Sequence, residues 1–310
     1  MSTGRRHMQE HNQAKEGAVT VQREEAGTTD AGDDSSVDPT LDSASGADHR
    51  FIRRISDPIP HDHLQHGPRV SIVVTVFNEG DTIVGSLDRI FESVRLPCEV
   101  LVVYDSPDDT TAPFVAEYAA RDLRVKPTLN TYGRGPARAI RFGVDHAAAP
   151  VVVVTMADGC DDPAQIDPLT RLVERGVVVA AASRYMRGGQ QVGGPWFKST
   201  LSRLAGRTLH TFARVGTNDA TNSFKAYNAE FVRAVGIESD AGFEVGLELV
   251  AKARRYRQPV AELPTIWLDR AFGVSNFKLA KWLPKYVRWY VYAYGPKLPL
   301  PPSASRHAHS

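Results

Sequence analysis

The chain has 310 residues, of which 42% are hydrophobic, enough to bury one large core or two modest ones. Its 37 basic and 36 acidic residues give a net charge of +1, so no field of the whole molecule attracts nucleic acid. The two cysteines lie on separate expected elements, which argues against a disulfide framework and favours a reducing compartment, the cytoplasm by default. No apolar run approaches the roughly 20 residues that span a bilayer. We expect an enzyme-sized α/β domain that does not cross a membrane by itself.

The two ends of the chain differ from its middle. Residues 1–66 are polar and show almost no apolar periodicity, so we expect a disordered N-terminal tail. Residues 297–310, with their prolines and terminal His-Ala-His, predict a second, shorter tail. This leaves a catalytic domain over 67–276 and a separate amphipathic segment over 277–296.

Strands and helices alternate between the tails. In chain order, the pattern predicts a strand at 70–77, a helix at 82–94, a strand at 99–104, a helix at 111–120, a short strand near 125, a helix at 137–147, a strand from 151, a helix at 166–174 and a strand at 177–182. Such alternation implies a parallel sheet with helices on both faces. Ligands of these sheets bind at the carboxyl ends of the strands.

Three of these strands end in acidic loops. The loops read FNEGD after the first strand, YDSPDDTT after the second and ADGCDDP after the strand from 151. Acids gathered on one rim repel one another and lose hydration, which favours a cation or a hydrogen-bonding ligand there. For the third loop the alternative is an Asp-rich turn with a helix cap at Asp162.

Seven segments, taken in order, resemble a known family. They are VSIVVTVFNE, LVVYDSPDDTT, GRGPARAIRFGVDHA, VVVVTMADGCDDP, VAAASRYMRGG, NDATNSFKAY and ELPTIWLDRAFGVSNFKL. Together they resemble the inverting family 2 glycosyltransferases, and within that family the dolichyl- and polyprenyl-phosphate mannose and glucose synthases. The resemblance covers roughly Arg69 to Leu279. It implies the GT-A fold, a Rossmann-like α/β fold with a mostly parallel central sheet flanked by helices, here followed by a C-terminal amphipathic helical segment.

The resemblance places the nucleotide on the first two loops. Phe77, Asn78 and Glu79 would line the base and ribose pocket, and Asp105 would accept hydrogen bonds from the base. A carboxylate suits both the imide of uracil and the edge of guanine, and the single acid here leaves UDP and GDP open. A cap on the turn is the alternative role of Asp105.

The third acidic loop corresponds to the family's Asp-x-Asp element, which binds a divalent metal and, through it, the sugar diphosphate. Asp158 matches the metal-binding acid, Met156 replaces the other acid, and Asp161 or Asp162 would supply a further ligand. Mg²⁺ or Mn²⁺, held by one or two carboxylates and phosphate oxygens, is the implied cofactor.

Basic residues complete the implied site. Arg134, Arg184 and Arg270 match family positions that neutralise the diphosphate or an acceptor phosphate, since a guanidinium fits phosphate oxygens. Taken singly, an arginine of this kind is more often a solvated surface residue than part of a site.

NDATNSFKAY resembles a family segment that approaches the sugar and the acceptor, which implies Asp219, Asn222 and Lys225 as site residues. The candidate catalytic residues are Asp158, Arg184, Asp219 and Arg270.

Two further acids lie one helical turn apart. Glu244 and Glu248 share a helix face and are candidates for a base or an acceptor contact. Pairing with Lys252 and Arg255 along an exposed face is the alternative. A phosphate acceptor needs no base because it is already ionised, whereas a hydroxyl acceptor requires one, with Asp219 or Glu244 as candidates.

The C-terminal segment combines an aromatic and a basic stripe. The aromatic residues are Trp282, Tyr286, Trp289 and Tyr290, and the basic ones are Lys278, Lys281, Lys285 and Arg288. This pattern suits the headgroup zone of an anionic membrane or, equally, a helix packed on the domain or a partner. Pro284 predicts a bent or two-part helix.

The residues and the resemblance together predict a metal-assisted transfer of a hexose, with inversion, from a nucleotide diphosphate sugar to a polyprenyl phosphate. The enzyme would be cytoplasmic, with a peripheral membrane contact through 277–296. One alternative keeps the donor but uses a soluble or natural-product hydroxyl acceptor. Another is a catalytically inactive nucleotide-sugar-binding module, because Met156 departs from the metal motif. The sugar and the oligomeric state stay open.

Overall fold

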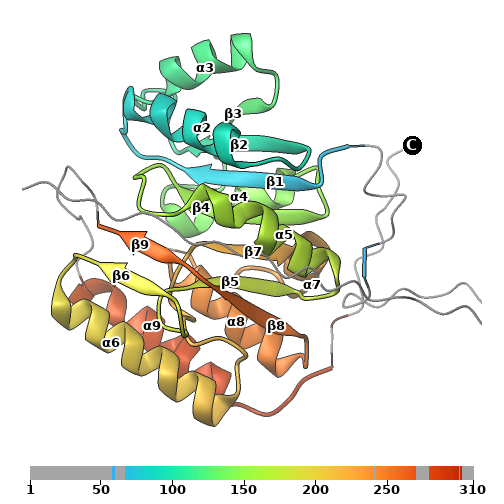
Figure 1. Ribbon diagram of the computed structural model, residues 1–310, viewed down its shortest axis with the longest axis vertical. Coiled ribbons are helices and arrows are strands. Elements are labelled where there is room, and N and C mark those ends of the chain that lie inside the picture. Colours follow the sequence, from blue (N-terminus) through green and yellow to red (C-terminus); the bar gives the residue numbers. More distant parts are fainter. Residues whose placement is uncertain (1–57, 60–66, 241, 270–278, 300, 302–310) are drawn as a thin grey trace, which may run out of the picture. The chain divides into compact units, whose positions relative to one another are not determined.

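The computed structural model describes residues 58–59, 67–240, 242–269, 279–299 and 301 (Figure 1). Its centre is a seven-stranded sheet in the order β3-β2-β1-β4-β7-β5-β8. The strands are β1 Val70–Thr75, β2 Cys98–Tyr104, β3 Val125–Leu129, β4 Val151–Met156, β5 Val179–Ser183, β7 Lys225–Asn228 and β8 Val260–Pro264. β7 runs antiparallel to both of its neighbours, and the other pairs are parallel. The predicted α/β fold with a mostly parallel sheet is confirmed.

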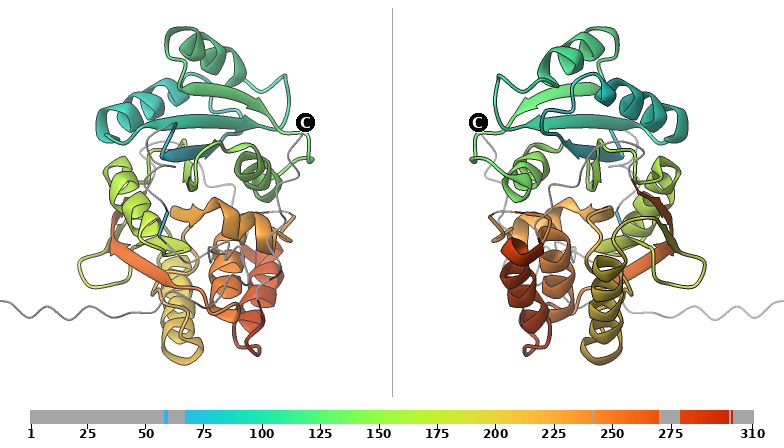
Figure 2. Two further views of the ribbon diagram at one scale, coloured as in Figure 1. Left: turned by 90° about the vertical axis from the view of Figure 1, so that its right-hand side faces the viewer. Right: turned by 90° about the vertical axis from the view of Figure 1, so that its left-hand side faces the viewer.

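Helices cover both faces of this sheet (Figure 2). On one face, α2 Thr82–Ser93, α3 Ala112–Arg121 and α5 Ile166–Glu174 pack with Ile72 and Val74. On the other face, α4 Pro136–His146, α7 Ala229–Val235, α8 Val245–Arg255 and α9 Leu279–Ala293 pack with Val73. Successive residues of a strand point to opposite faces, and both faces here are buried. Buried faces explain why β1 and β4 read as nearly continuous apolar runs.

A smaller, parallel two-stranded sheet joins β6 Gln190–Val192 to β9 Ile266–Leu268. After β6 the chain forms α6 Trp196–Thr208, which continues into a π-helical turn, η2 Leu209–Ala213. Gly206 of α6 lies so close to the Asn218 carbonyl oxygen that an added Cβ would clash with it. A glycine is therefore what lets α6 approach the loop around Asn218.

The predicted element boundaries agree closely with the structure. The helix over Ile166–Glu174 has the predicted bounds. β1 ends at Thr75 instead of at Phe77, which leaves Phe77 in the following loop. α4 begins at Pro136, one residue before the predicted start, since proline fits the first helical turn, where its missing N–H has no intrahelical partner.

Of the two predicted forms of the C-terminal helix, the two-part form is wrong, and a bend at Pro284 stays a prediction. α9 is one helix from Leu279 to Ala293 with Pro284 inside it. Pro284 is the sixth residue of α9, so its missing N–H removes one intrahelical hydrogen bond, the one to the carbonyl of residue 280. The helix continues beyond it to Ala293. None of the described helices combines the length and the apolar character that crossing a bilayer requires.

Two residues from the ranges predicted as tails contact the domain. Ile59 is buried, and its N–H donates to the Glu174 carbonyl at 2.9 Å. The N–H of Leu298 donates to the Arg255 carbonyl at 2.7 Å. At these positions the structure differs from the tail prediction, because each backbone group finds a partner at the end of a helix.

Candidate active site

The three acidic loops leave the sheet at one edge. In the parallel pairing, Thr75 at the end of β1 lies beside Val103 of β2 and Met156 of β4. The three strands therefore stop nearly level, and their loops open on the same side (Figure 1). This is the convergence that the sequence predicts.

The loop after β1 is tied to the loop after β2. Asn78, in the left-handed region at φ 54°, donates its N–H to the Asp109 carboxylate at 3.1 Å. The N–H of Glu79 donates to Thr111 Oγ1 at 3.0 Å. Phe77, which precedes Asn78, is 68% exposed, so its ring has open space beside it. Sequence reasoning missed Asp109, although the Asp109–Thr111 stretch carries the signal of a side chain that binds its own backbone two residues on.

Asp105 holds the loop between β3 and α4. Its carboxylate accepts hydrogen bonds from Asn130 Nδ2 and from the N–H of Gly135, each at 2.7 Å. Arg134, which is exposed, lies in the loop that these contacts fix. The alternative role, in which Asp105 holds a turn, therefore describes both of these contacts. A carboxylate has further lone pairs that could accept a bond from a base, and this base contact stays a prediction. Asn130 carries no sequence signal beyond its position at the end of a strand.

Asp158 and Asp161 lie together in the loop after β4. Asp158 Oδ1 accepts from the Cys160 N–H at 3.1 Å, and Asp161 accepts from Thr155 Oγ1 at 2.9 Å. Burial, and then the negative charge of Asp158, raises the pKa of Asp161 to about 7. A buried carboxyl group beside a second carboxylate is one that a bound cation would stabilise in its ionised form.

The described residues contain no group of three or more His, Cys, Asp or Glu side chains suited to a metal. A metal at Asp158 and Asp161 would therefore take further ligands from phosphate or water, as Mg²⁺ commonly does.

Asp162 does not belong to this pair. Its side chain accepts from the Ala164 N–H at 3.0 Å and caps the short 3₁₀ turn η1 Pro163–Gln165. The capping alternative therefore describes the contact of Asp162, while the charge of Asp158 acts on Asp161, and the choice between the two as the further ligand stays a prediction.

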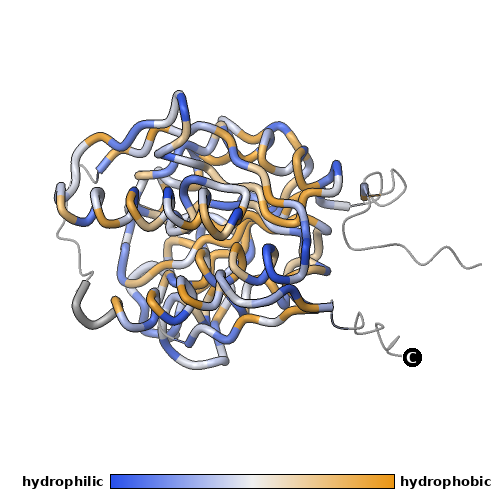
Figure 3. The backbone as a smooth tube through the Cα atoms, turned by 90° about the horizontal axis from the view of Figure 1, so that it is seen from below, coloured by the Kyte–Doolittle hydropathy of each residue, from blue (hydrophilic) through white to orange (hydrophobic). Residues whose placement is uncertain are grey.

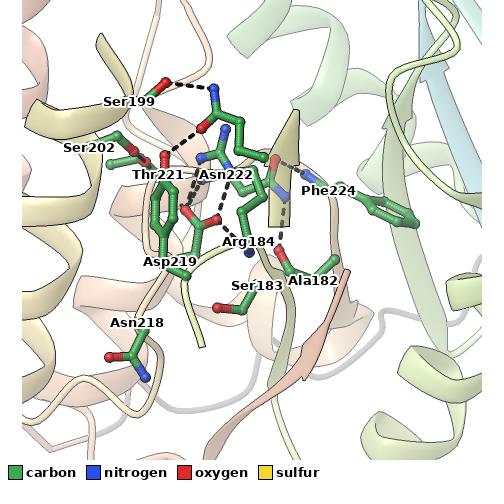
Figure 4. Close-up of polar contacts among 12 residues, drawn as sticks. Ala182, Ser183, Arg184, Ser199, Ser202, Asn218, Asp219, Thr221, Asn222 and Phe224 are labelled. Carbon is green, nitrogen blue, oxygen red and sulfur yellow. Dashed lines mark hydrogen bonds and ion pairs between the residues drawn. The ribbon is translucent and has the colours of Figure 1, made fainter. Parts of the chain in front are cut away.

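Asp219 and Arg184 form a buried, two-pronged ion pair (Figure 4). Arg184 Nε donates to Asp219 Oδ2 at 2.7 Å, and Nη2 donates to Oδ1 at 2.9 Å. Asp219 is 0% exposed, and burial by itself would raise its pKa. The charge and hydrogen bonds of Arg184 outweigh burial and hold the pKa of Asp219 below its ordinary value. These contacts use two of the five N–H groups of the guanidinium.

Asn222 and Lys225 follow Asp219 in the chain and hold its loop in place. Asn222 Nδ2 donates to the Ala182 carbonyl at 2.8 Å, which fastens the Asp219 loop to β5 (Figure 4). The Lys225 ammonium is fully buried and donates to the carbonyls of Ala220 and Asn222. Burial lowers the pKa of Lys225 to about 7. The hydrogen bonds of both side chains are with backbone atoms of this loop and, for Asn222, also of β5.

The two glutamates at the start of α8 have different surroundings. Glu248 pairs with Lys252 at 2.7 Å, as the alternative expected, but both side chains are buried instead of exposed. Glu244 is 1% exposed, and neither of its carboxylate oxygens has a hydrogen-bond partner. Burial, and then the charge of Glu244, raises the pKa of Tyr286 on α9, and Arg184 opposes this rise. Arg270 lies outside the described residues.

Sequence comparison agrees with this geometry. The model of the family described as glycosyl transferase family 2 matches residues 71–236. A polyprenol monophosphomannose synthase of Mycolicibacterium smegmatis is 26% identical over 230 residues, which cover 69% of this chain and 86% of that protein. A dolichol-phosphate mannosyltransferase of Pyrococcus furiosus is 28% identical over 224 residues, 71% of this chain. The match spans only 62% of the length of the latter.

Solved structures share the fold. A mannosyltransferase from Pyrobaculum calidifontis, in complex with GDP-Man and Mn²⁺, superposes with a TM-score of 0.50 at 20% identity, covering 76% of this chain and 64% of that one. A glucosyl-3-phosphoglycerate synthase from Mycobacterium tuberculosis, in complex with Mn²⁺, UDP and glucosyl-3-phosphoglycerate, gives a TM-score of 0.54 at 17% identity, covering 75% and 82%. The family model covers more than half of the chain, and the fold is GT-A-like. The chain therefore belongs to glycosyltransferase family 2 and is a glycosyltransferase.

Proposed function

We propose that this glycosyltransferase moves a hexose, with inversion, from a UDP- or GDP-sugar to a polyprenyl phosphate. The observation that carries the proposal is the Asp158–Asp161 pair on the same sheet edge as the loops at Phe77–Glu79 and Asp105. Relatives named for polyprenol and dolichol phosphate support the acceptor class. Membership in an enzyme family makes the inactive binding module the weaker alternative.

In this proposal the donor lies across the first two loops. The exposed ring of Phe77 offers a stacking face for the base. Asn78 and Glu79 are held beside it by the loop after β2. Asp105 would accept from the base, and exposed Arg134 would meet the diphosphate as a planar fork.

Asp158 and Asp161 would hold Mg²⁺ or Mn²⁺. Their carboxylate oxygens suit a hard cation, and a cation would offset the burial and the charge of Asp158 that together raise the pKa of Asp161. When bound, the metal would neutralise charge on the leaving nucleotide diphosphate. The solved relatives with Mn²⁺ in their complexes support this choice of cation.

The acceptor phosphate would lie above the Asp219–Arg184 pair. It needs no base, because it is ionised near neutral pH, so positioning and charge stabilisation are what the protein must supply. The N–H groups of Arg184 that Asp219 does not engage would bind it, and Arg270 is proposed as a second cation.

A direct test uses labelled GDP-mannose, GDP-glucose and UDP-glucose with a short-chain polyprenyl phosphate and Mn²⁺. The proposal expects label in the organic extract from one of these donors and none with the dephosphorylated polyprenol. Label found only in aqueous products with soluble alcohol acceptors would contradict it.

A hydroxyl acceptor is the second candidate, and Glu244 is the observation that favours it. The two candidate bases differ, because Asp219 is committed to Arg184 while both oxygens of Glu244 lack partners. A buried carboxylate without partners costs stability unless a ligand group meets it.

Glu244→Gln separates the two acceptors. If a hydroxyl is the acceptor, we expect turnover to fall about 100-fold or more, with the donor KM unchanged, because a general base contributes about that much. If a phosphate is the acceptor, turnover stays near the wild-type value. Glu238→Gln is the matched control, since Glu238 is an exposed partner of Arg288.

A further inference from the structure

The solvent-facing side of α6 and η2 is unusually apolar. Large hydrophobic side chains lie exposed along it: Trp196, Phe197, Leu201, Leu204 and Phe212. Leu204 is 59% and Phe212 73% exposed. The buried side of α6 is instead made of small and polar residues such as Ser202 and Gly206. An amphipathic helix of a globular domain usually buries its apolar side, whereas α6 exposes it. An exposed apolar face of this kind is typical of an interaction surface.

The charge of this segment has one sign. Residues 196–214 contain no Asp or Glu, but they contain Lys198, Arg203, Arg207 and Arg214. In the chain as a whole the numbers of acidic and basic residues are nearly equal. A partner for this face is therefore apolar with an anionic border.

A cationic hollow lies along the same helix. It has a volume of about 230 Å³ and is lined by Tyr185, Met186, Arg187, Arg203, Arg207 and Asn218. Arg203 lies 5.2 Å from the centre of the Tyr185 ring, and none of the lining residues is acidic. Three guanidinium groups around a hollow of this size fit the phosphate of a headgroup.

α9 extends the apolar face. The Tyr290 hydroxyl donates to Thr208 Oγ1 at 2.9 Å, which joins α9 to the end of α6. The two helices lie at the same end of the domain (Figure 2), and seen from below the helices there alternate hydrophobic and hydrophilic positions (Figure 3). The exposed apolar residues of α9 are Leu283, Val287 and Val291, and the exposed Tyr294 follows the helix. Residues 279–297 also contain no acid, and Lys285 and Arg288 pair with Asp240 and Glu238 of the segment before α8.

From these observations we infer that α6 and η2, with the outer side of α9, form a docking surface for an anionic lipid bilayer. The exposed apolar side chains enter the headgroup and acyl boundary, and the arginine-lined hollow receives a lipid phosphate. This surface is larger than the membrane contact predicted from the sequence, which involved residues 277–296 alone, because most of its exposed apolar side chains come from α6 and η2. It stands independently of the proposed acceptor.

The surface is coupled to the candidate active site. Ser202 of α6 hydrogen-bonds Thr221, two residues after Asp219 (Figure 4). The clash that any side chain at Gly206 would make with Asn218 shows how closely the helix supports that loop. A bilayer bound to the outer side of α6 would therefore lie across this one helix from the loop that carries Asp219.

The test is flotation of the full chain with vesicles that contain neither donor nor polyprenyl phosphate, so that its outcome does not depend on sugar transfer. We expect binding to vesicles of phosphatidylglycerol and phosphatidylcholine, and little binding to phosphatidylcholine alone. Leu204→Glu with Phe212→Glu should weaken binding about tenfold or more, because two apolar anchors are lost and acids face the lipid. Arg203→Gln with Arg207→Gln should weaken it and flatten its salt dependence.

Leu123→Glu is the matched control, since Leu123 is 89% exposed in the turn before β3. It should bind like the wild type. Equal binding by the wild type and the Leu204→Glu, Phe212→Glu variant, at unchanged thermal stability, would overturn the inference. So would a wild-type dimer in solution that this variant converts to a monomer, because the face would then belong to a second copy of the chain.

Discussion

Asp219 and Arg184 depend on each other at the scale of single residues. The carboxylate also accepts from the backbone N–H groups of Arg184 and Asn222, at 3.0 and 3.2 Å. The pair thus fixes the end of β5 to the loop before β7. Sequence resemblance placed both residues in the site, but no pattern could show that they bind each other, because 35 positions separate them.

Arg184→Met should destabilise the protein by about 3–5 kcal/mol, because it leaves the Asp219 carboxylate buried without its counterion. Adding Asp219→Asn should restore a large part of this loss, since the uncompensated charge is then gone. Urea unfolding of the two single variants and the double variant measures both. If the stability losses of the two single variants simply sum in the double variant, the ion pair does not couple these two residues.

At the scale of elements, the sequence predicts the parallel sheet and its acidic rim well. β1 and β4 read as buried runs, and the residues after them end up at one edge because parallel strands stop level. The orientation of α9 could not be predicted. Its aromatic stripe suits a membrane and a core equally, and tertiary packing decides between them. Trp289 is 1% exposed, donates from its indole N–H to Ser239 Oγ at 3.0 Å and packs on α8.

Trp289→Ala should therefore cost about 3–5 kcal/mol of folding free energy, because it empties a large, packed position in the core. Val291→Ala on the outer side of α9 should cost little in solution, since Val291 is 62% exposed. Thermal and urea unfolding compare the two. Similar small losses would mean that α9 is not an integral part of the domain.

Over the whole molecule, stability should depend on pH through the buried charges. The pKa of Lys225 is about 7 in the folded state and lies near 10.5 when the chain is unfolded. Between these values the unfolded chain binds the extra proton, so this group adds stability as pH rises from about 7 toward 10 and withdraws it as pH falls.

As pH rises across this window, the free energy of unfolding of the wild type should increase relative to that of Lys225→Met, by up to about 1.4 kcal/mol per pH unit. Melting temperatures of both proteins at several pH values between 7 and 10 give the difference. A difference that shrinks as pH rises would contradict the lowered pKa.

The central claim is that Asp158 helps to hold a cation that bridges to the donor diphosphate. Thermal shift with GDP and UDP, each with and without Mn²⁺, tests it most directly, because a ligand that prefers the folded state raises the melting temperature. We predict that one nucleotide stabilises the wild type only with Mn²⁺, that Asp158→Asn abolishes the shift, and that Asp162→Asn, which removes a charge but can still cap the turn, keeps it. A full Mn²⁺-dependent shift in Asp158→Asn would contradict the account.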